Sequence, residues 1–354
     1  MRRHPSGIDE RVRPPRTTAH RPASRQEPEL TADPPPTSRR PRRPGPAQPA
    51  RPARAGGTRP GIDLHAHSTA SDGLLTPEEL VRRAAETGLR VLALTDHDTT
   101  AGIERAAAVL PDGLTLLPGA EISCYAMVGG RRVSMHILAY LFDPAEPEFA
   151  AARARLRDSR ATRARRIVEK IAADGHPVTW ERVRQLARGA VGRPHIAAAL
   201  LEAGLVRSID EAFTPDWIGS GGRYSATKDE PDVWETLRLI RGAGGVSVFA
   251  HPFASARGAI VTEQTVADMA GAGLVGIEVD HPDHPPATRD RLRALAAELG
   301  LVTTGSSDFH GTSKPQGLGA EMTSPEAYEA IVAAATGASP ITRESAAALG
   351  PTGD

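Results

Sequence analysis

Short apolar runs alternate with helical patterns from residue 61 onward. Six such runs end near residues 64, 94, 117, 250, 277 and 304. Between them lie segments with the spacing of amphipathic helices. The first has a capping box, Thr76-Pro77-Glu78-Glu79, followed by Leu80, Val81 and Ala84 on one face. Alternation of strands and helices indicates an α/β fold with a mainly parallel sheet.

The pattern predicts two sets of elements. The strands are expected near residues 62–64, 91–95, 114–117, 122–128, 133–140, 246–250, 274–279 and 301–304. The helices are expected near residues 76–88, 100–109, 150–173, 180–187, 195–203, 209–213, 263–272, 288–299 and 325–335. Strand signals vanish between residues 146 and 240, which predicts a helical insertion that caps the site. An α/β barrel is expected, with its site at the carboxyl ends of the strands.

The two ends of the chain have a different composition from its body. Residues 1–60 contain 14 arginines, 14 prolines and five acidic residues, whereas residues 61–354 contain 29 basic and 38 acidic ones. A segment with so many prolines cannot build a core, so we expect residues 1–60 to form a disordered tail. The tail would be either a solvated extension or an electrostatic arm for RNA or another polyanion. Residues 346–354 are expected to form a flexible C-terminus.

Composition also limits the location of the protein. No apolar stretch reaches the ~20 residues of a membrane span, so we expect no membrane association. Cys124 is the only cysteine, which excludes an intrachain disulfide and favours a reducing, cytoplasmic location. The sequence does not indicate an oligomeric state.

Histidine and carboxylate residues follow the apolar runs. His65 and His67, spaced i and i+2 at a strand end, can face the same ion. Neutral imidazole and carboxylate ligands without a thiolate suit Zn, Mn or Fe. Candidate ligands after the runs are His65, His67, Asp72, Asp96, His97, Glu121, His251, Glu278, Asp308 and His310, whereas His136 lies inside a strand, where a single histidine is more often a core residue.

Six segments together resemble the PHP (polymerase and histidinol phosphatase) family over residues 61–345. They are Ile62–Ser68, Ser71–Gly73, Leu94–Thr99, Pro118–Glu121, Ala250–Pro252 and Ser307–Gly311. Gly192-Arg193-Pro194-His195 and the segment from Gly244 to Pro252 look most like the nucleoside 3′,5′-bisphosphate phosphatase / RNase AM type. The resemblance implies a distorted (β/α)7-type PHP barrel with a helical insertion.

The resemblance also implies a centre of two or three divalent ions, with Mn expected and Zn, Fe or Mg as alternatives. His65, His67, Glu121 and Asp308 would hold one ion. Glu121 would bridge to a second ion, held also by His136 and His251. The third would be held by Asp72, His97 and His310.

The expected activity is hydrolysis of nucleotide phosphate esters by a hydroxide that bridges two ions. The substrates would be 3′,5′-nucleoside bisphosphates or short RNA trimmed from its 5′ end. Two alternatives stay open. One is a phosphatase for a small metabolite such as histidinol phosphate, and the other is a non-catalytic binding module with a PHP-like fold.

Four residues of the insertion are candidates for substrate contacts. Arg193 precedes a helix and could grip phosphate, and His195 could bind the same phosphate or protonate the leaving group. Arg223 could bind a second phosphate, and Tyr224 could stack on a base. A further group, Glu278 with Asp280, His281 and His284, is predicted to lie in a loop at the rim of the site. The arginine run from Arg153 to Arg166 is either a solvated helix face or a nucleic-acid contact surface.

Overall fold

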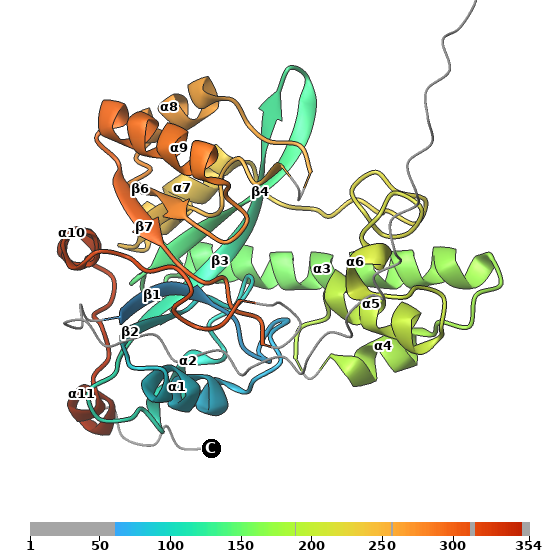
Figure 1. Cartoon of the computed structure of the whole chain (residues 1–354), viewed down its shortest axis with the longest axis horizontal. Coiled ribbons are helices and arrows are strands. Elements are labelled where there is room, and N and C mark those ends of the chain that lie inside the picture. The colour runs from blue at the N-terminus through green and yellow to red at the C-terminus, as the bar shows by residue number, and fades with distance from the viewer. Residues whose placement is uncertain (1–60, 188, 256–257, 312–315, 349–354) are drawn as a thin grey trace, which may run out of the picture. The chain divides into compact units, whose positions relative to one another are not determined.

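Seven strands form one sheet in which the spatial order follows the chain, from β1 to β7 (Figure 1). The computed structural model describes residues 61–187, 189–255, 258–311 and 316–348, so the predicted tail lies outside the described residues. The strands are β1 (Gly61–Ala66), β2 (Leu89–Leu94), β3 (Thr115–Val128), β4 (Arg131–Tyr140), β5 (Val246–Phe249), β6 (Gly276–Asp280) and β7 (Val302–Gly305).

The sheet is parallel except around β4. β1, β2 and β3 pair in parallel, as do β5, β6 and β7, whereas β4 is antiparallel to both β3 and β5. Gly129 and Gly130, with φ of 56° and 77°, form the predicted hairpin turn between β3 and β4. Just beyond β1 the His67 amide donates to the Phe309 carbonyl at 2.8 Å, which links the two edges of the sheet. The predicted α/β fold is confirmed, and the sheet has the seven strands that the family resemblance implies.

β3 differs from the prediction because two expected strands form a single strand. It runs through Pro118 and Gly119 without a break and pairs with β2 at one end and β4 at the other. A Cβ at Gly119 would lie 2.8 Å from the Ala139 carbonyl, so only glycine allows this close pairing. As a result Glu121 lies inside a strand, with its backbone fixed on both sides.

Helices surround the sheet and form the insertion. They are α1 (Pro77–Glu86), α2 (Ile103–Ala107), α3 (Pro147–Ala173), α4 (Trp180–Leu186), α5 (Arg193–Glu202), α6 (Ile209–Ala212), α7 (Val233–Gly242), α8 (Glu263–Gly271), α9 (Pro286–Leu299), α10 (Pro325–Ala334) and α11 (Arg343–Ala348). The capping box at Thr76 is present. α7 and α11 were not predicted, and α11 reaches into the expected flexible C-terminus; residues 349–354 lie outside the described part.

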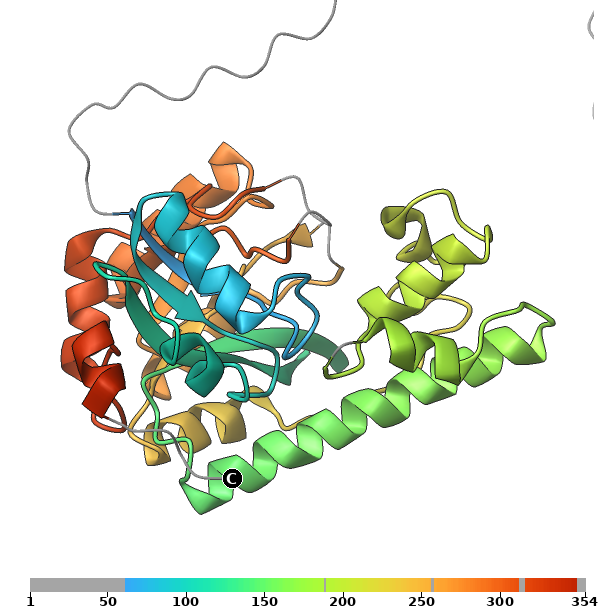
Figure 2. The ribbon, with the colours of Figure 1, turned by 90° about the horizontal axis from the view of Figure 1, so that it is seen from below.

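Five consecutive helices, α3 to α7, fill the region in which the sequence predicts a helical insertion. The second half of α3 packs against α4 and α5, and its Ile167, Ile171 and Ala164 share a buried apolar cluster with Ile196 of α5 (Figure 2). The first half of α3 runs beside the sheet. No helix in the described ranges is both long and apolar enough to cross a bilayer.

Candidate metal centre

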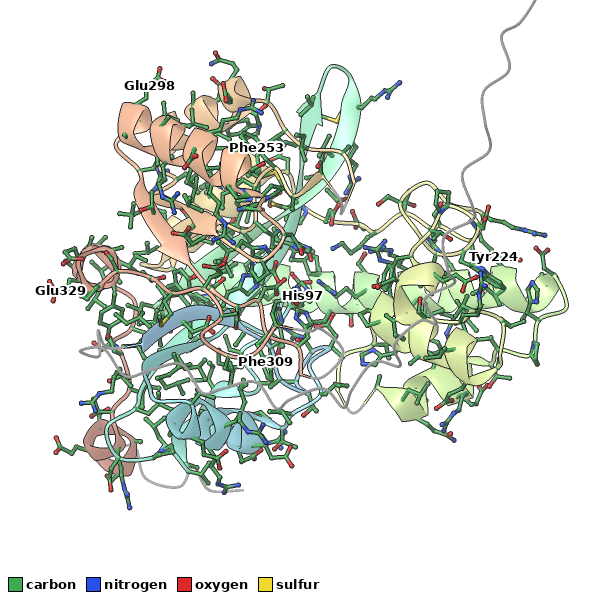
Figure 3. The ribbon with its side chains drawn as sticks, viewed as in Figure 1. His97, Tyr224, Phe253, Glu298, Phe309 and Glu329 are labelled. Atoms are coloured by element: carbon green, nitrogen blue, oxygen red, sulfur yellow. The ribbon has the colours of Figure 1, made fainter. Side chains whose placement is uncertain are left out.

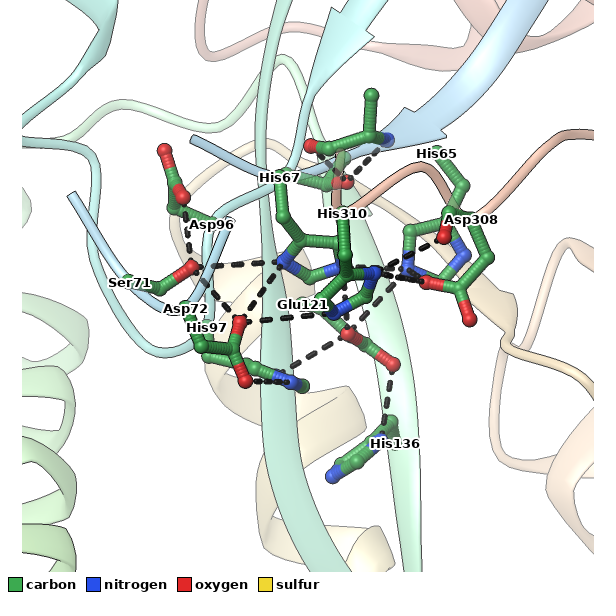
Figure 4. A network of polar contacts seen from close by, with 12 residues as sticks. His65, His67, Ser71, Asp72, Asp96, His97, Glu121, His136, Asp308 and His310 are labelled. Atoms are coloured by element: carbon green, nitrogen blue, oxygen red, sulfur yellow. Dashed lines mark hydrogen bonds and ion pairs between the residues drawn. The ribbon is translucent and has the colours of Figure 1, made fainter. Parts of the chain in front are cut away.

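The predicted ligands converge on Glu121, which is 1% exposed at the centre of the cluster (Figure 4). Its Oε1 lies 2.8 Å from His136 Nδ1 and 2.9 Å from His251 Nε2. Its Oε2 lies 3.2 Å from both His65 Nε2 and His67 Nε2 and 3.1 Å from His97 Nδ1. One carboxylate therefore faces histidines that lie in or just beyond β1, β2, β4 and β5.

Two further carboxylates lie on either side of Glu121. Asp308 Oδ1 is 3.5 Å from His65 Nε2 and 3.4 Å from His67 Nε2. Asp72 lies 3.7 Å from His97 and 3.5 Å from His310, with 3.8 Å to His67 Nδ1. The structure thus brings all nine predicted ligands together in adjoining groups. His67 and His97 lie between groups, so each borders two candidate ion positions.

The spacing of these atoms fits shared cations. Nitrogen and oxygen ligands about 2.1 Å from one ion lie about 3.0–3.4 Å from each other at octahedral or tetrahedral angles. The Nε2 atoms of His65 and His67 are 3.0 Å apart, and the neighbouring carboxylate oxygens match the same range. Nδ1 of His97 and Nδ1 of His136 are buried and make no hydrogen bond among the described residues, although both lie near Glu121. Nitrogen lone pairs directed at a common cation account for this geometry.

The charges of the cluster also fit cations. Burial alone would raise the pKa of Glu121, but His97, His136 and His65 hold it well below its ordinary value. Burial, with nearby Arg160, lowers the pKa of His97, which keeps its ring neutral, as a metal ligand requires. Burial would lower the pKa of His67 as well, but Asp308 and Glu121 raise it to about 9. A proton and a metal ion therefore compete at this ring.

Three buried carboxylates hold the loops that carry the ligands. Asp96 accepts hydrogen bonds from the hydroxyls of Ser68 and Ser71, both at 2.6 Å, and so fixes the loop after β1. Asp63 accepts from the Ser307 amide at 3.0 Å and its hydroxyl at 2.6 Å, and so fixes the loop after β7. Asp98 accepts from the Ser123 amide at 2.7 Å. These three residues position ligands and do not belong to the cluster itself.

Three residues in or beside the cluster have an unusual backbone conformation. Asp98, His251 and Asp308 have φ of 57°, 34° and 47°, in the left-handed region that non-glycine residues rarely adopt. Such strain persists where surrounding contacts enforce it, and it concentrates at functional sites. All three residues lie in or beside the cluster.

Comparison with known proteins agrees with the geometry. The PHP domain family matches residues 63–172. The chain is 35% identical over 256 residues to the 3′,5′-nucleoside bisphosphate phosphatase of Chromobacterium violaceum, covering 70% of this chain and 87% of that protein. It is also 35% identical over 252 residues to a 5′-3′ exoribonuclease of Haemophilus influenzae, covering 70% and 89%. A solved Bifidobacterium adolescentis structure, provisionally described as a metal-dependent phosphoesterase, superposes with a TM-score of 0.72 at 36% identity, covering 78% and 97%.

The chain belongs to the PHP family. Its nine candidate ligands follow the order that the resemblance implies, and the insertion lies between the histidine of β4 and the histidine after β5. The PHP centre therefore draws on residues from 65 to 310, almost the full length of the described chain.

Two of the four predicted substrate residues lie beside the PHP centre. A Cβ at Gly192, which directly precedes α5, would be 3.8 Å from Asp72 Oδ2. The start of α5, with Arg193 and His195, therefore borders the Asp72 group. His195 Nδ1 accepts the Gly192 amide at 3.0 Å, which leaves Nε2 to carry the proton of the neutral ring.

The structure does not bring Arg223 and Tyr224 to the centre. Asp174, just after α3, accepts from Arg223 at 2.6 Å and from the Tyr224 hydroxyl at 2.8 Å. Asp174 lies 14 helical positions beyond Arg160, about 20 Å along the axis. Figure 3 shows Tyr224 within the insertion, well separated from His97. Tyr224 is 2% exposed and packs against Trp217. Arg223 and Tyr224 therefore make contacts within the insertion, contrary to the prediction that they contact the substrate.

A cluster of basic residues lies near the start of α5. Arg193 was a predicted substrate contact, and Arg160 and Arg163 belong to the predicted arginine run, but the sequence did not indicate that they meet at one place. We call Arg160, Arg163, Arg193 and Lys228 the cationic wall. Arg160 donates to Asp98 at 2.5 Å and to Ser123 at 3.0 Å, while its Nη1 lies 4.0 Å from the Cβ position of Gly192. Within the arginine run of α3 the helical period alone cannot identify Arg160 as buried, because it packs on polar groups.

Glu278, Asp280, His281 and His284 were expected in a loop at the rim of the site. Glu278 and Asp280 instead lie in β6, whereas His281 and His284 follow that strand but are buried. Glu278 is in β6 and 0% exposed, and His281 is 1% exposed. Glu278 Oε1 lies 3.1 Å from His65 Nδ1, and Asp308 Oδ2 lies 3.4 Å from His281 Nε2. Asp280 instead forms ion pairs with Arg289 and Arg293 of α9. Glu278 and His281 are therefore buried beside the candidate ligands His65 and Asp308.

Proposed function

We propose that this protein is a metal-dependent phosphoesterase that hydrolyses phosphate esters of nucleotides. The observation that carries the proposal is the gathering of nine candidate ligands into adjoining groups, with five histidines around the Glu121 carboxylate, beside the cationic wall. A divalent cation cluster and a set of guanidinium groups recognise the same chemistry, a phosphate group.

The residues present would hold two or three ions in the arrangement that the family implies. When bound, such ions activate water as a nucleophile at neutral pH and neutralise the phosphate oxygens. Mn is the ion that we propose; imidazole and carboxylate ligands without a thiolate accept it, as they accept Zn or Fe. The intact ligand set also argues against the alternative of a non-catalytic binding module.

The cationic wall supports phosphate recognition. Burial, together with the neighbouring Arg193 and Arg160, lowers the pKa of Arg163 to about 9. Burial similarly lowers the pKa of Lys228 to about 8, although Glu230 lies 2.8 Å from its amine. Nε of Arg163 is buried and has no hydrogen-bond partner among the described residues. Buried like charges of this kind are stabilised by an anion.

His195 would donate a hydrogen bond to a phosphate oxygen of the substrate. Its Nδ1 accepts from the Gly192 amide, so the proton of the neutral ring is on Nε2, and the ring belongs to the same helix start as Arg193. Burial lowers the pKa of His195, which keeps the ring in this neutral form. Arg193 would bind the same phosphate.

Two phosphate-binding regions, the metal centre and the cationic wall, favour a substrate with two phosphates. A 3′,5′-nucleoside bisphosphate or the 5′ end of a short RNA meets this requirement, whereas histidinol phosphate carries only one phosphate. The relatives from Chromobacterium violaceum and Haemophilus influenzae bear names of these two activities.

A substrate panel tests the proposal. With Mn supplied, we expect turnover of adenosine 3′,5′-bisphosphate or of a 5′-phosphorylated short RNA to exceed that of histidinol phosphate. Arg193→Ala should raise KM for the bisphosphate and leave the bound metal unchanged, while the exposed Arg207→Ala serves as the control. Preference for histidinol phosphate would support the small-metabolite alternative. Absence of both bound metal and turnover would support a binding module.

A further inference from the structure

β6 supplies two buried polar residues that face ligands but are not themselves among the nine. β6 lies between β5 and β7 in the sheet, so the side chains at its carboxyl end border His251 on one side and Asp308 on the other. Glu278 and His281 occupy these positions. Neither falls in a candidate cation group among the described residues.

Every partner of the Glu278 carboxylate is a donor. Oε1 faces His65 Nδ1 at 3.1 Å and accepts the Ser306 hydroxyl. Oε2 accepts the His251 amide at 2.7 Å, at a residue with φ of 34°. With Nδ1 of His65 donating to Glu278, the lone pair of that ring must be on Nε2, the atom that faces Glu121 and Asp308.

The tautomer of His281 follows from its hydrogen bonds. Its Nδ1 accepts the Asp283 amide at 3.0 Å, so the neutral ring carries its proton on Nε2. That Nε2 lies 3.4 Å from Asp308 Oδ2. The two oxygens of Asp308 therefore have different partners. Oδ2 faces the His281 donor, and Oδ1 faces His65 and His67 of the cluster.

We propose that Glu278 and His281 are a positioning pair that determines which atom each ligand presents to the cations. Glu278 selects Nε2 of His65 and holds the backbone of His251, and His281 selects Oδ1 of Asp308. The pair thus aligns ligands from β1, β5 and β7 without binding an ion. The inference rests on the metal centre proposed above and is independent of the substrate.

The alternative role, an additional cation site at the end of β6, does not fit these contacts. His281 Nδ1 is occupied by a backbone amide, and His284 Nδ1 is directed at the Val279 carbonyl at 2.8 Å. The Asp280 carboxylate is paired with arginines of α9. Of this group only His284 Nε2 is buried without a hydrogen-bond partner among the described residues, and a single nitrogen does not make a cation site.

Matched substitutions at position 281 separate the two ends of the ring. In His281→Gln the amide nitrogen takes the place of Nε2 and keeps a donor toward Asp308. In His281→Asn the amide oxygen takes the place of Nδ1 and keeps the Asp283 contact, but the donor is lost. Glu278→Gln is a second, independent variant. Its amide NH2 would face one of the three donors that the carboxylate now accepts from, which are His65 Nδ1, the Ser306 hydroxyl and the His251 amide. His176→Asn, in the insertion, is the control.

The measurement is Co²⁺ affinity by competition with a chromophoric chelator, together with the visible spectrum of bound Co²⁺. We expect His281→Asn and Glu278→Gln to weaken binding about 10- to 100-fold and to alter the spectrum. His281→Gln and His176→Asn should stay within about threefold of the reference protein. Equal effects of Asn and Gln at position 281, or reference-like affinity of Glu278→Gln, would overturn the proposal. A reference protein that binds Co²⁺ but hydrolyses none of the panel would refute the proposed function alone.

Discussion

Replacing Asp98 with alanine tests whether the insertion is fixed to the metal centre through one buried ion pair. The Asp98 side chain is fully buried and lies 2.5 Å from Arg160, whose side chain is 13% exposed. It also accepts the Ser123 amide at 2.7 Å and the Ser123 hydroxyl at 3.0 Å. The substitution leaves a buried guanidinium and a buried amide without this acceptor.

The expected cost is large because only one partner of the pair is removed. Breaking a buried ion pair in this way destabilises a protein by about 3–5 kcal/mol. For a domain of this size, each kcal/mol lowers the Tm by about 2–4 °C, so the Tm should fall by about 6–20 °C. Arg160 would also lose its fixed position in the cationic wall, and KM for the bisphosphate should rise.

Thermal and urea unfolding of Asp98→Ala measure the effect, with Asp112→Ala as the matched control. Asp112 also pairs with an arginine, Arg343 at 2.7 Å, but these side chains are 82% and 62% exposed. Exposed pairs contribute about 0–1 kcal/mol, so the control should unfold near the reference. Equal losses in both variants, or a loss below about 1 kcal/mol for Asp98→Ala, would refute the reasoning.

The effect should also depend on pH. Burial alone would raise the pKa of Asp98, but Arg160 and Lys228 hold it below its ordinary value. A carboxyl group with a lowered folded-state pKa stabilises the protein above its unfolded pKa of about 4, and this stabilisation is lost as the pH falls through the folded-state pKa. The difference between the reference and Asp98→Asn should therefore shrink below about pH 4; a difference that grows there would contradict this.

Two further predictions concern the metal centre, and a third concerns Cys124 of β3. Removing metal with a chelator should abolish hydrolysis, and added Mn should restore it. Glu121→Gln loses the proposed bridging carboxylate, so its turnover, measured by steady-state kinetics with excess Mn, should fall at least about 100-fold. Because His67 in the metal-free protein has a pKa raised to about 9, cation affinity should rise with pH up to about 9, with proton release detectable by calorimetry in two buffers; a flat profile would exclude this competition. Burial raises the pKa of the Cys124 thiol, so a thiol reagent should modify it only after unfolding, and fast modification of the native protein would show that β3 is exposed.

The gathering of the nine candidate ligands and most of the elements could be predicted from the sequence, because local motifs and the family resemblance point to the same residues. A strand that ends in His65-Ala66-His67 or Asp96-His97 shows its period and its chemistry within a few residues. Glu121 needed the resemblance as well, and its place inside a single strand was not predicted, because a Pro-Gly step normally ends a strand. Here β4 and β2 hold that step in extended form from both sides.

The residues that position the ligands could not be predicted, because their roles depend on contacts across the whole barrel. Glu278 reaches His65, 213 positions earlier, and nothing near it in the sequence indicates this pairing. Arg160 is one of many arginines along α3, and only the fold identifies which one meets Asp98. Arg223 and Tyr224 were misplaced for the reverse reason, since a short basic-aromatic pair resembles a binding motif whatever it contacts.

The wide spacing of the ligands along the chain has a consequence for biosynthesis. Five of the nine, His65 to Glu121, emerge early, whereas Asp308 is translated 187 residues after Glu121. At about 5–20 residues per second, roughly 10–40 s separate these two events on the ribosome. During that interval the nascent chain carries only part of the candidate ligand set. The complete set can therefore come together only after the last strand has been made, so binding of ions by all nine residues would be a late step in the maturation of this protein.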